Sequence, residues 1–167
     1  AALAVVSGSD AEVPTSLGID VRLTLQDAIL ARTDLKTADL KLSNLQTGYY
    51  KNYLSYPTVI GTIAFPRQWA SVDVKIRGKE FRFVTTHLEA YHQAIRVAQA
   101  QELLALLAQS KLPIILVGDF NSQPADRVDA AYVLLEGGLR DLWSVKYPSD
   151  PGFTCCQAPD LANPDSI

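Results

Sequence analysis

Residues 114–121 read IILVGDFN, and the rest of the fold can be worked out from this stretch. Its first half is a short, continuous apolar run, which is typical of a strand in a sheet covered on both faces. The run ends at Gly118, which allows close backbone approach, and at Asp119 and Asn121, which can face the same way. Because α/β sheets present ligands where strands end, we expect these two side chains to line a site. A carboxylate beside a carboxamide suits a phosphoester or a hard cation, and a simple turn is the structural alternative.

A second polar group precedes this strand, in the sequence TTHLE at residues 85–89. His87 is expected to end a hairpin strand, Glu80–Leu88, just before a helix that leads to the GDFN turn. Both groups then lie at strand ends on one rim of the sheet. A protonated imidazole there could donate to a phosphate oxygen, although a lone histidine at a strand end is more often structural. For Glu89 we favour a surface carboxylate at the start of the helix over a role beside His87.

The remaining pattern alternates short strands and helices. Apolar periodicity predicts a helix over Tyr91–Gln109 that buries Ala94, Val97, Ala98, Gln101, Leu104, Ala105 and Ala108, and a second helix over Arg127–Glu136. Strands are expected at Val21–Leu25, Asp27–Arg32 (with a helical turn as the alternative), Lys41–Leu45, Thr58–Phe65 and Trp69–Ile76. Residues 1–18 show no clean period. This order predicts an α/β layered sandwich with a mixed sheet, and one domain over residues 1–167.

Composition narrows the classes of protein. The chain has 167 residues, a formal charge of −3, 48% hydrophobic residues, no Met and only two His. These values exclude a disordered chain or a coiled coil, and they disfavour nucleic-acid binding through a broad basic surface. The one basic cluster, Lys75–Arg82, is interpreted as a solvated hairpin tip, with phosphate steering as the alternative.

Two further features have structural interpretations. Cys155 and Cys156 are adjacent, which excludes a disulfide framework and a cysteine-based zinc site. For this pair we favour two thiols over a vicinal disulfide. The aromatic residues Tyr49, Tyr50, Tyr53, Tyr56 and Trp69 could form a stacking surface for bases or an apolar lip for lipid, and sheet packing is favoured.

THLE and GDFN, in this order with a helix between them, resemble the endonuclease/exonuclease/phosphatase superfamily, which has the DNase I-like fold. The DAILAR segment (27–32) and the GFTC segment (152–155) also resemble the family. The resemblance implies a four-layer α/β sandwich with mixed, largely antiparallel sheets. It also implies hydrolysis of a phosphoester by water with Mg²⁺, with Mn²⁺ or Ca²⁺ as alternatives.

The resemblance also implies roles for individual residues. His87 matches the histidine that contacts the scissile phosphate, and Asp119 matches the aspartate that orients or activates water and can bind a cation. Asn121 matches the asparagine that contacts phosphate or metal. The substrate class implied is a nucleic acid, a phospholipid or a sugar phosphate, and the sequence does not distinguish among them.

Several family features are not matched in this sequence. The first-strand Asn, the metal-binding Glu and the C-terminal Asp-His pair have no counterpart in it. We therefore expect the chain to be the central portion of the domain, incomplete at both ends and less active than the whole. A catalytically inactive domain used for binding or assembly is the alternative. Compartment stays open, and a cleaved secretory signal upstream is compatible with the sequence.

Overall fold

The computed structural model describes residues 2–13, 21–32, 34–35, 39–59, 61–124, 129–156, 158–160 and 162, with side chains from residue 25 onward. The chain forms two compact units, residues 1–121 and residues 122–167. Within the ranges given above, no helix has the length and apolar character needed to cross a membrane.

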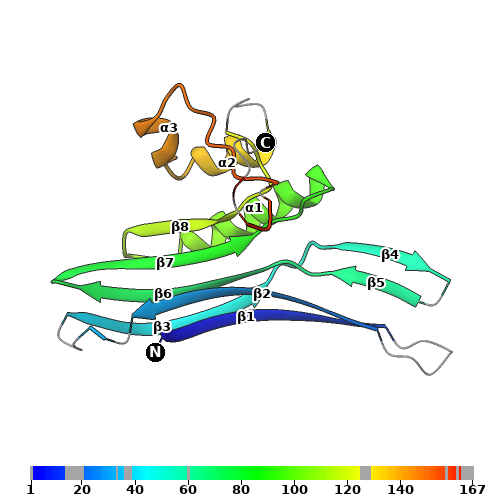
Figure 1. Cartoon of the computed structure of the whole chain (residues 1–167), viewed down its shortest axis with the longest axis horizontal. Coiled ribbons are helices and arrows are strands. Elements are labelled where there is room, and N and C mark those ends of the chain that lie inside the picture. Colours follow the sequence, from blue (N-terminus) through cyan, green and yellow to red (C-terminus); the bar gives the residue numbers. More distant parts are fainter. Residues whose placement is uncertain are drawn as a thin grey trace. The chain divides into compact units, whose positions relative to one another are not determined.

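A four-stranded sheet is the centre of the first unit (Figure 1). Its order is β3 (Leu40–Tyr49), β6 (Gln68–Ile76), β7 (Lys79–His87) and β8 (Ile114–Asp119). β3, β6 and β7 are antiparallel, and β6 turns into β7 through Arg77 and Gly78, which both have positive φ angles. β8 runs parallel to β7, because the helix α1 (Gln93–Leu107) carries the chain back between them. The mixed, largely antiparallel sheet predicted from the sequence is confirmed.

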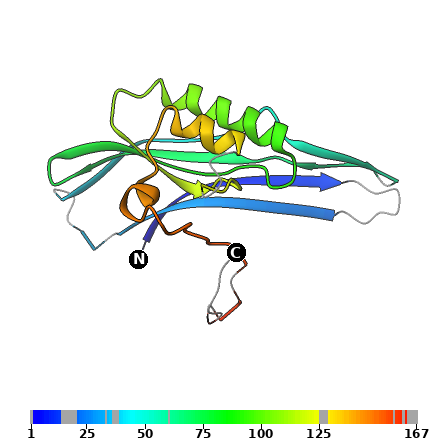
Figure 2. The same cartoon turned by 90° about the horizontal axis from the view of Figure 1, so that it is seen from above.

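Two layers cover this sheet. The long hairpin of β1 (Ala2–Val13) and β2 (Val21–Arg32) lies on one side and α1 on the other (Figure 2). Under the hairpin, Ile29 packs with Ala70, Val72 and Val74 of β6 in a buried apolar cluster. The strand β1 has no clear sequence period, so its existence was not predicted, and pairing with β2 along its whole length accounts for it. β2 is one strand where two short ones were expected.

The strand predicted over Thr58–Phe65 is wrong. Its residues belong to two strands of a separate hairpin, β4 (Leu54–Thr58) and β5 (Gly61–Phe65). The chain reverses between Thr58 and Gly61, which pair with each other, and Gly61 has a φ of 139°, which side-chain-bearing residues rarely adopt. The β-branched run therefore contains a turn that its composition conceals.

The face of α1 that is buried also differs from the prediction. The helix buries Arg96, Gln99, Ala100, Leu103 and Leu107, a stripe that includes two polar residues. Arg96 donates to the backbone carbonyls of Glu89 and Ala90, and Gln99 donates to that of Asn52. These hydrogen bonds to backbone carbonyls offset the cost of burying two polar side chains. Hydrophobic periodicity does not take such bonds into account, and it therefore predicted that Arg96 and Gln99 lie in solvent.

β8 is covered on one face only. Ile115 and Val117 are 43% and 38% exposed, whereas the sequence predicted cover on both faces. In the sheet order β8 is an edge strand, and the β1–β2 hairpin packs over β6 and β7.

The second unit contains two short helices, α2 (Ala130–Glu136) and α3 (Leu142–Lys146). Asp129 caps the first and Asp141 the second, each accepting two backbone N–H groups. The Tyr132 hydroxyl also donates to Asp141 at 3.1 Å, which ties the two helices together. The predicted helix over Arg127–Glu136 is confirmed from Ala130 onward, and its residues 127 and 128 lie outside the described ranges.

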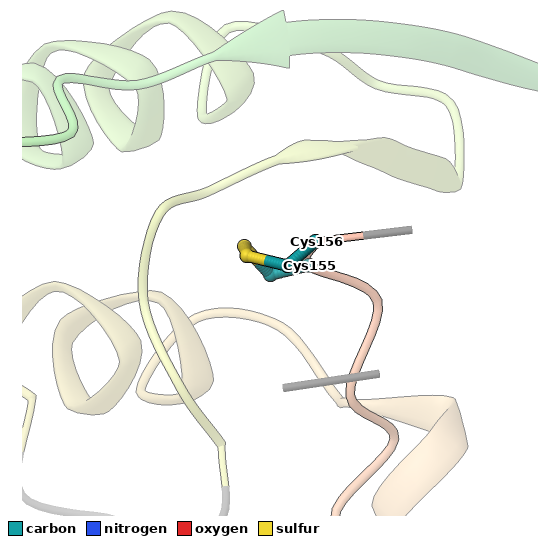
Figure 3. The surroundings of a disulfide bond; sticks show 2 residues. All are labelled: Cys155 and Cys156. Atoms are coloured by element: carbon teal, nitrogen blue, oxygen red, sulfur yellow. A yellow bond between two sulfur atoms is a disulfide. The ribbon is translucent and has the colours of Figure 1, made fainter. Parts of the chain in front are cut away.

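Cys155 and Cys156 form a disulfide between adjacent residues (Figure 3). The expectation of two thiols is therefore wrong. Cys156 has a φ of 66°, and this local backbone conformation could not be inferred from cysteine spacing.

Candidate active site

The parallel strands β7 and β8 end level with each other (Figure 1). His87 and Asp119 are the last residues of these strands and are partners in the register. His87 Nε2 lies 3.7 Å from Asp119 Oδ2, too far for a hydrogen bond but within reach of a bridging group. The sheet thus brings together two of the three candidate residues.

Gly118 makes this close approach feasible. Its φ is 146°, and a Cβ at this position would lie 2.0 Å from the carbonyl oxygen of Thr86. No side chain fits there, since the backbones of β7 and β8 touch one residue before the pair of polar groups.

Asn121 completes the group and joins the two strand ends. Its backbone N–H donates to Asp119 Oδ1 at 2.9 Å, and its Nδ2 donates to the Leu88 carbonyl at 2.9 Å. The Leu88 N–H donates in turn to the Asp119 carbonyl, also at 2.9 Å. Asn121 has a φ of 47°, a conformation that Asn tolerates better than most residues. With Nδ2 engaged at Leu88, Oδ1 is the side-chain atom best suited to a cation.

The surroundings of His87 favour a neutral ring. Burial lowers the pKa of its imidazole, and the positive charge of Arg67 lowers that pKa further. The carboxylates of Asp119, Asp27 and Glu89 act in the opposite direction but do not outweigh the first two effects. A lowered pKa favours the neutral ring over the protonated one considered above, and a neutral ring can still donate one N–H.

A small hollow of about 50 Å³ opens beside His87. Its walls are Leu25, Gln26, Asp27, Pro66, Arg67, Gln68 and His87. The sequence did not indicate Asp27 or Arg67, because they come from β2 and from the segment before β6, far from THLE and GDFN in the chain. The hollow is large enough for a water or a single small polar group.

Glu89 is not the surface carboxylate that was expected. Its side chain is 1% exposed, and Oε2 lies 3.7 Å from Arg67 Nε. Within the described ranges neither of these two atoms has a hydrogen-bond partner. Glu89 Oε1 accepts the Tyr91 N–H, and the Glu89 N–H donates to Gln99. Glu89 thus holds the turn between β7 and α1 and places a negative charge behind His87.

The chemistry of Asp119 and Asn121 suits a hard cation, because Mg²⁺ prefers carboxylate and amide oxygens. The Asp119 side chain is 63% exposed, so its oxygens are accessible. In the part of the chain that the structure describes, no group of three or more His, Cys, Asp or Glu side chains is arranged so that these residues alone could hold a metal ion. Two oxygens would hold a Mg²⁺ together with water and substrate oxygens.

No protein-family profile and no curated protein matches the chain. Among solved structures it is similar to TDP2 from D. rerio in complex with a single-stranded DNA product. The two share 18% identity over 75% of this chain and 45% of TDP2, with a TM-score of 0.50. It is also similar to a conserved protein of unknown function from Enterococcus faecalis V583, at 17% identity, 79% and 49% coverage and a TM-score of 0.50.

An endonuclease/exonuclease/phosphatase family protein from Bacteroides thetaiotaomicron matches at 21% identity, 79% and 45% coverage and a TM-score of 0.47. The chain spans about half the length of these structures. The class of fold that the motifs predicted is confirmed: the chain has a DNase I-like α/β fold, which it shares with TDP2.

Proposed function

We propose that the chain is the central part of the catalytic domain of a metal-dependent phosphoesterase. The reaction is hydrolysis of a phosphodiester or a phosphomonoester by an activated water. The observation that carries the proposal is the convergence of His87, Asp119 and Asn121 at one end of two parallel strands. An inactive domain retained for binding has no need of this convergence, so the arrangement favours the catalytic alternative.

The three side chains have complementary tasks in this scheme. Asp119, whose side chain is exposed, orients the attacking water and accepts its proton as the new P–O bond forms and the P–O bond to the leaving group breaks. The neutral His87 donates an N–H to a phosphoryl oxygen, where negative charge increases in the transition state. Asn121 holds the ends of β7 and β8 at a constant separation, so that both groups reach the same phosphorus.

Asp119 and the Asn121 amide oxygen would hold the Mg²⁺. When bound, the cation would offset charge on the phosphoryl oxygens. The substrate is a nucleic acid, a phospholipid or a sugar phosphate, and plasmid DNA and sphingomyelin separate the first two of these classes in the test below.

The proposal is tested on the protein that contains this chain. Hydrolysis is measured for a chromogenic phosphodiester, a chromogenic phosphomonoester, plasmid DNA and sphingomyelin, with Mg²⁺ and with EDTA. We expect turnover of at least one substrate with Mg²⁺ and none with EDTA. Asp119→Ala should lower kcat by about 10²–10⁴-fold, the usual contribution of a positioned acid–base group.

The matched control is Asp34→Ala. Asp34 is an exposed carboxylate whose side chain pairs with Arg32 on the surface, so its removal should leave kcat unchanged. The proposal is refuted if no substrate is turned over with Mg²⁺, or if Asp119→Ala is as active as the unaltered protein.

A further inference from the structure

The chain leaves β7 at His87, and the two residues that follow are held in place by other elements. Leu88 donates its N–H to the Asp119 carbonyl and accepts from Asn121 Nδ2, so the end of β8 fixes it. Glu89 is held by a different element. Leu88 and Glu89 are both buried, and buried backbone groups need partners of this kind.

The helix α1 supplies the partners of Glu89. The Glu89 N–H donates to Gln99 Oε1 at 2.8 Å, and the Glu89 carbonyl accepts from Arg96 Nη1 at 3.0 Å. The same Arg96 nitrogen also donates to the Ala90 carbonyl at 3.0 Å. Arg96 and Gln99, called the α1 clamp below, therefore hold the backbone of two consecutive residues soon after His87.

Arg96 is an unusual residue for its place in the helix. It lies at the end of the first turn of α1, where the helix dipole disfavours a cation, and its charge is costly to bury. The first turn has no acidic residue, and His92 before it makes no side-chain cap hydrogen bond in the described part of the chain. The stability of the helix thus does not account for Arg96, whereas its bonds to the two carbonyls do.

Gln99 extends the α1 clamp to a third segment. Its Nε2 donates to the Asn52 carbonyl at 2.8 Å, in the connection between β3 and β4. Gln99 is 0% exposed, so both of its hydrogen bonds are made away from water. Such bonds are strong, and their loss leaves buried polar groups without partners.

The segment that Gln99 reaches also contacts β7, through Tyr50. The Tyr50 hydroxyl shares a 2.6 Å hydrogen bond with Thr86 Oγ1, one residue before His87. The sheet packing predicted for the aromatic residues is therefore confirmed for Tyr50, which is buried, and wrong for three that are about half exposed, Tyr49, Tyr53 and Tyr56. β7 is thus supported immediately before His87, and the α1 clamp supports the chain soon after it.

These supports matter for catalysis because the two reacting side chains do not hold each other. His87 Nε2 lies 3.7 Å from Asp119 Oδ2, beyond hydrogen-bond distance, so the backbone sets their separation. A misplacement of about 1 Å at a reacting group can cost about 10²-fold in rate.

We propose that Arg96 and Gln99 are positioning residues of the hydrolytic site. They fix the backbone after His87 and so hold its imidazole at the phosphoryl group, next to Asp119. Neither side chain touches the substrate, since each acts through the backbone of residues 89 and 90. This role presupposes the hydrolysis proposed above, and it gives α1 a part in the site equivalent to that of Asn121 on the β8 side.

The first readout is kinetic, on the protein that contains this chain. Gln99→Met keeps the length of the side chain and removes both hydrogen bonds, and Arg96→Met removes the guanidinium. Each should lower kcat by about tenfold or more with KM nearly unchanged, because His87 contacts the phosphoryl group most strongly in the transition state. Arg96→Lys can still donate to the carbonyls and should recover most of the lost kcat.

Two control variants separate positioning from a loss of stability. Gln101→Met makes the same chemical change at an exposed position of α1, so it should leave both kcat and the urea midpoint unchanged. Asp73→Asn breaks the pair with Arg82, near the opposite end of β7 from His87, so it should lower the urea midpoint without lowering kcat. Circular dichroism checks that each variant keeps its secondary structure.

The second readout is spectroscopic and needs no turnover. The imidazole signals of His87 are recorded by nuclear magnetic resonance and assigned by their loss in His87→Gln. They should shift or broaden in Gln99→Met and in Arg96→Met, and return in Arg96→Lys. Gln101→Met and Asp73→Asn should leave them unchanged.

Three outcomes overturn the role of the α1 clamp. The first is an unaltered protein that hydrolyses a substrate while Gln99→Met and Arg96→Met keep their full kcat. The second is an equal loss of kcat in Asp73→Asn, since the effect would then be one of stability. The third is a set of His87 signals that neither clamp variant changes. If the unaltered protein hydrolyses nothing, the proposed function fails, and these signals alone decide whether α1 fixes the imidazole.

Discussion

Replacing Gly118 by Ala tests whether the close approach of β7 and β8 holds the candidate site together. A Cβ at this position would lie 2.0 Å from the Thr86 carbonyl oxygen, and real Cβ atoms essentially never come closer than 3.0 Å to such an atom. The Thr86 carbonyl is part of the backbone of β7, which is paired with β8, so it cannot rotate away as a side chain would. β8 must therefore move away from β7 by about 1 Å next to Asp119.

The cost has two parts. Overpacking in a close-packed region costs about 1–3 kcal/mol. A side chain held at the Gly118 φ of 146° adds a further 1–3 kcal/mol, roughly, because this backbone region is essentially restricted to glycine. We expect the free energy of unfolding to fall by about 2–6 kcal/mol, a large part of the 5–15 kcal/mol that is typical of a domain.

The assay is urea denaturation followed by circular dichroism, with Gly78→Ala as the matched control. Gly78 lies in the β6–β7 turn with a φ of 77°, and no atom lies within 4 Å of a Cβ built there. This control has the backbone strain without the clash, so it should cost only about 1–2 kcal/mol. The difference between the two variants contains the contact with Thr86 and any excess strain at the φ of 146° over that at 77°.

The reasoning is refuted if the free energies of unfolding of Gly118→Ala and Gly78→Ala differ by less than about 0.5 kcal/mol. Differences of this size are within the usual error of additivity for independent substitutions. Such a result would mean that β8 is free to shift at no cost, and that Gly118 does not set the distance between His87 and Asp119.

Two further predictions concern stability. Asp73 accepts hydrogen bonds from Arg82 Nε at 2.7 Å and Nη2 at 3.1 Å, and this side-chain bonding lowers the pKa of Asp73. The pair therefore stabilises the fold above the ordinary pKa of Asp, and this contribution is lost as pH falls through the lowered value. Asp73→Asn should cost about 1.5–3 kcal/mol at pH 7, measured by urea denaturation, and progressively less as pH falls below the ordinary pKa of Asp. A cost that stays constant over the whole acid range would contradict the prediction. Tyr50→Phe removes the buried 2.6 Å bond between the tyrosine hydroxyl and Thr86 Oγ1, so it should cost about 1 kcal/mol in thermal denaturation, and an unchanged midpoint would contradict that.

The central strands and α1 were predictable because their signals are local. β6 and β7 alternate in polarity, β8 is an apolar run that ends in glycine, and Pro113 separates it from the helix. Each of these signals depends on a few neighbouring residues. The sequence therefore indicated the order of strand, helix and strand that places His87 and Asp119 at one rim.

The features that the sequence did not predict have a shared physical cause. Each depends on hydrogen-bond partners that lie far away in the chain. β1 is a strand because β2 pairs with it along its whole length. Arg96 and Gln99 are buried because backbone carbonyls outside the helix accept from them. Neither periodicity nor composition contains these partners.

Sequence alone determined which chemical groups are available to the site. It supplied one imidazole, one carboxylate and one amide at strand ends, and a glycine at the position where two backbones must touch. Only the tertiary structure determines the distances among these groups and how deeply each is buried. The register of parallel strands brings His87 to 3.7 Å from Asp119. Burial of the ring and the charge of Arg67 lower the pKa of His87. Distances and burial arise from segments far apart in the chain, and for that reason a linear pattern cannot contain them.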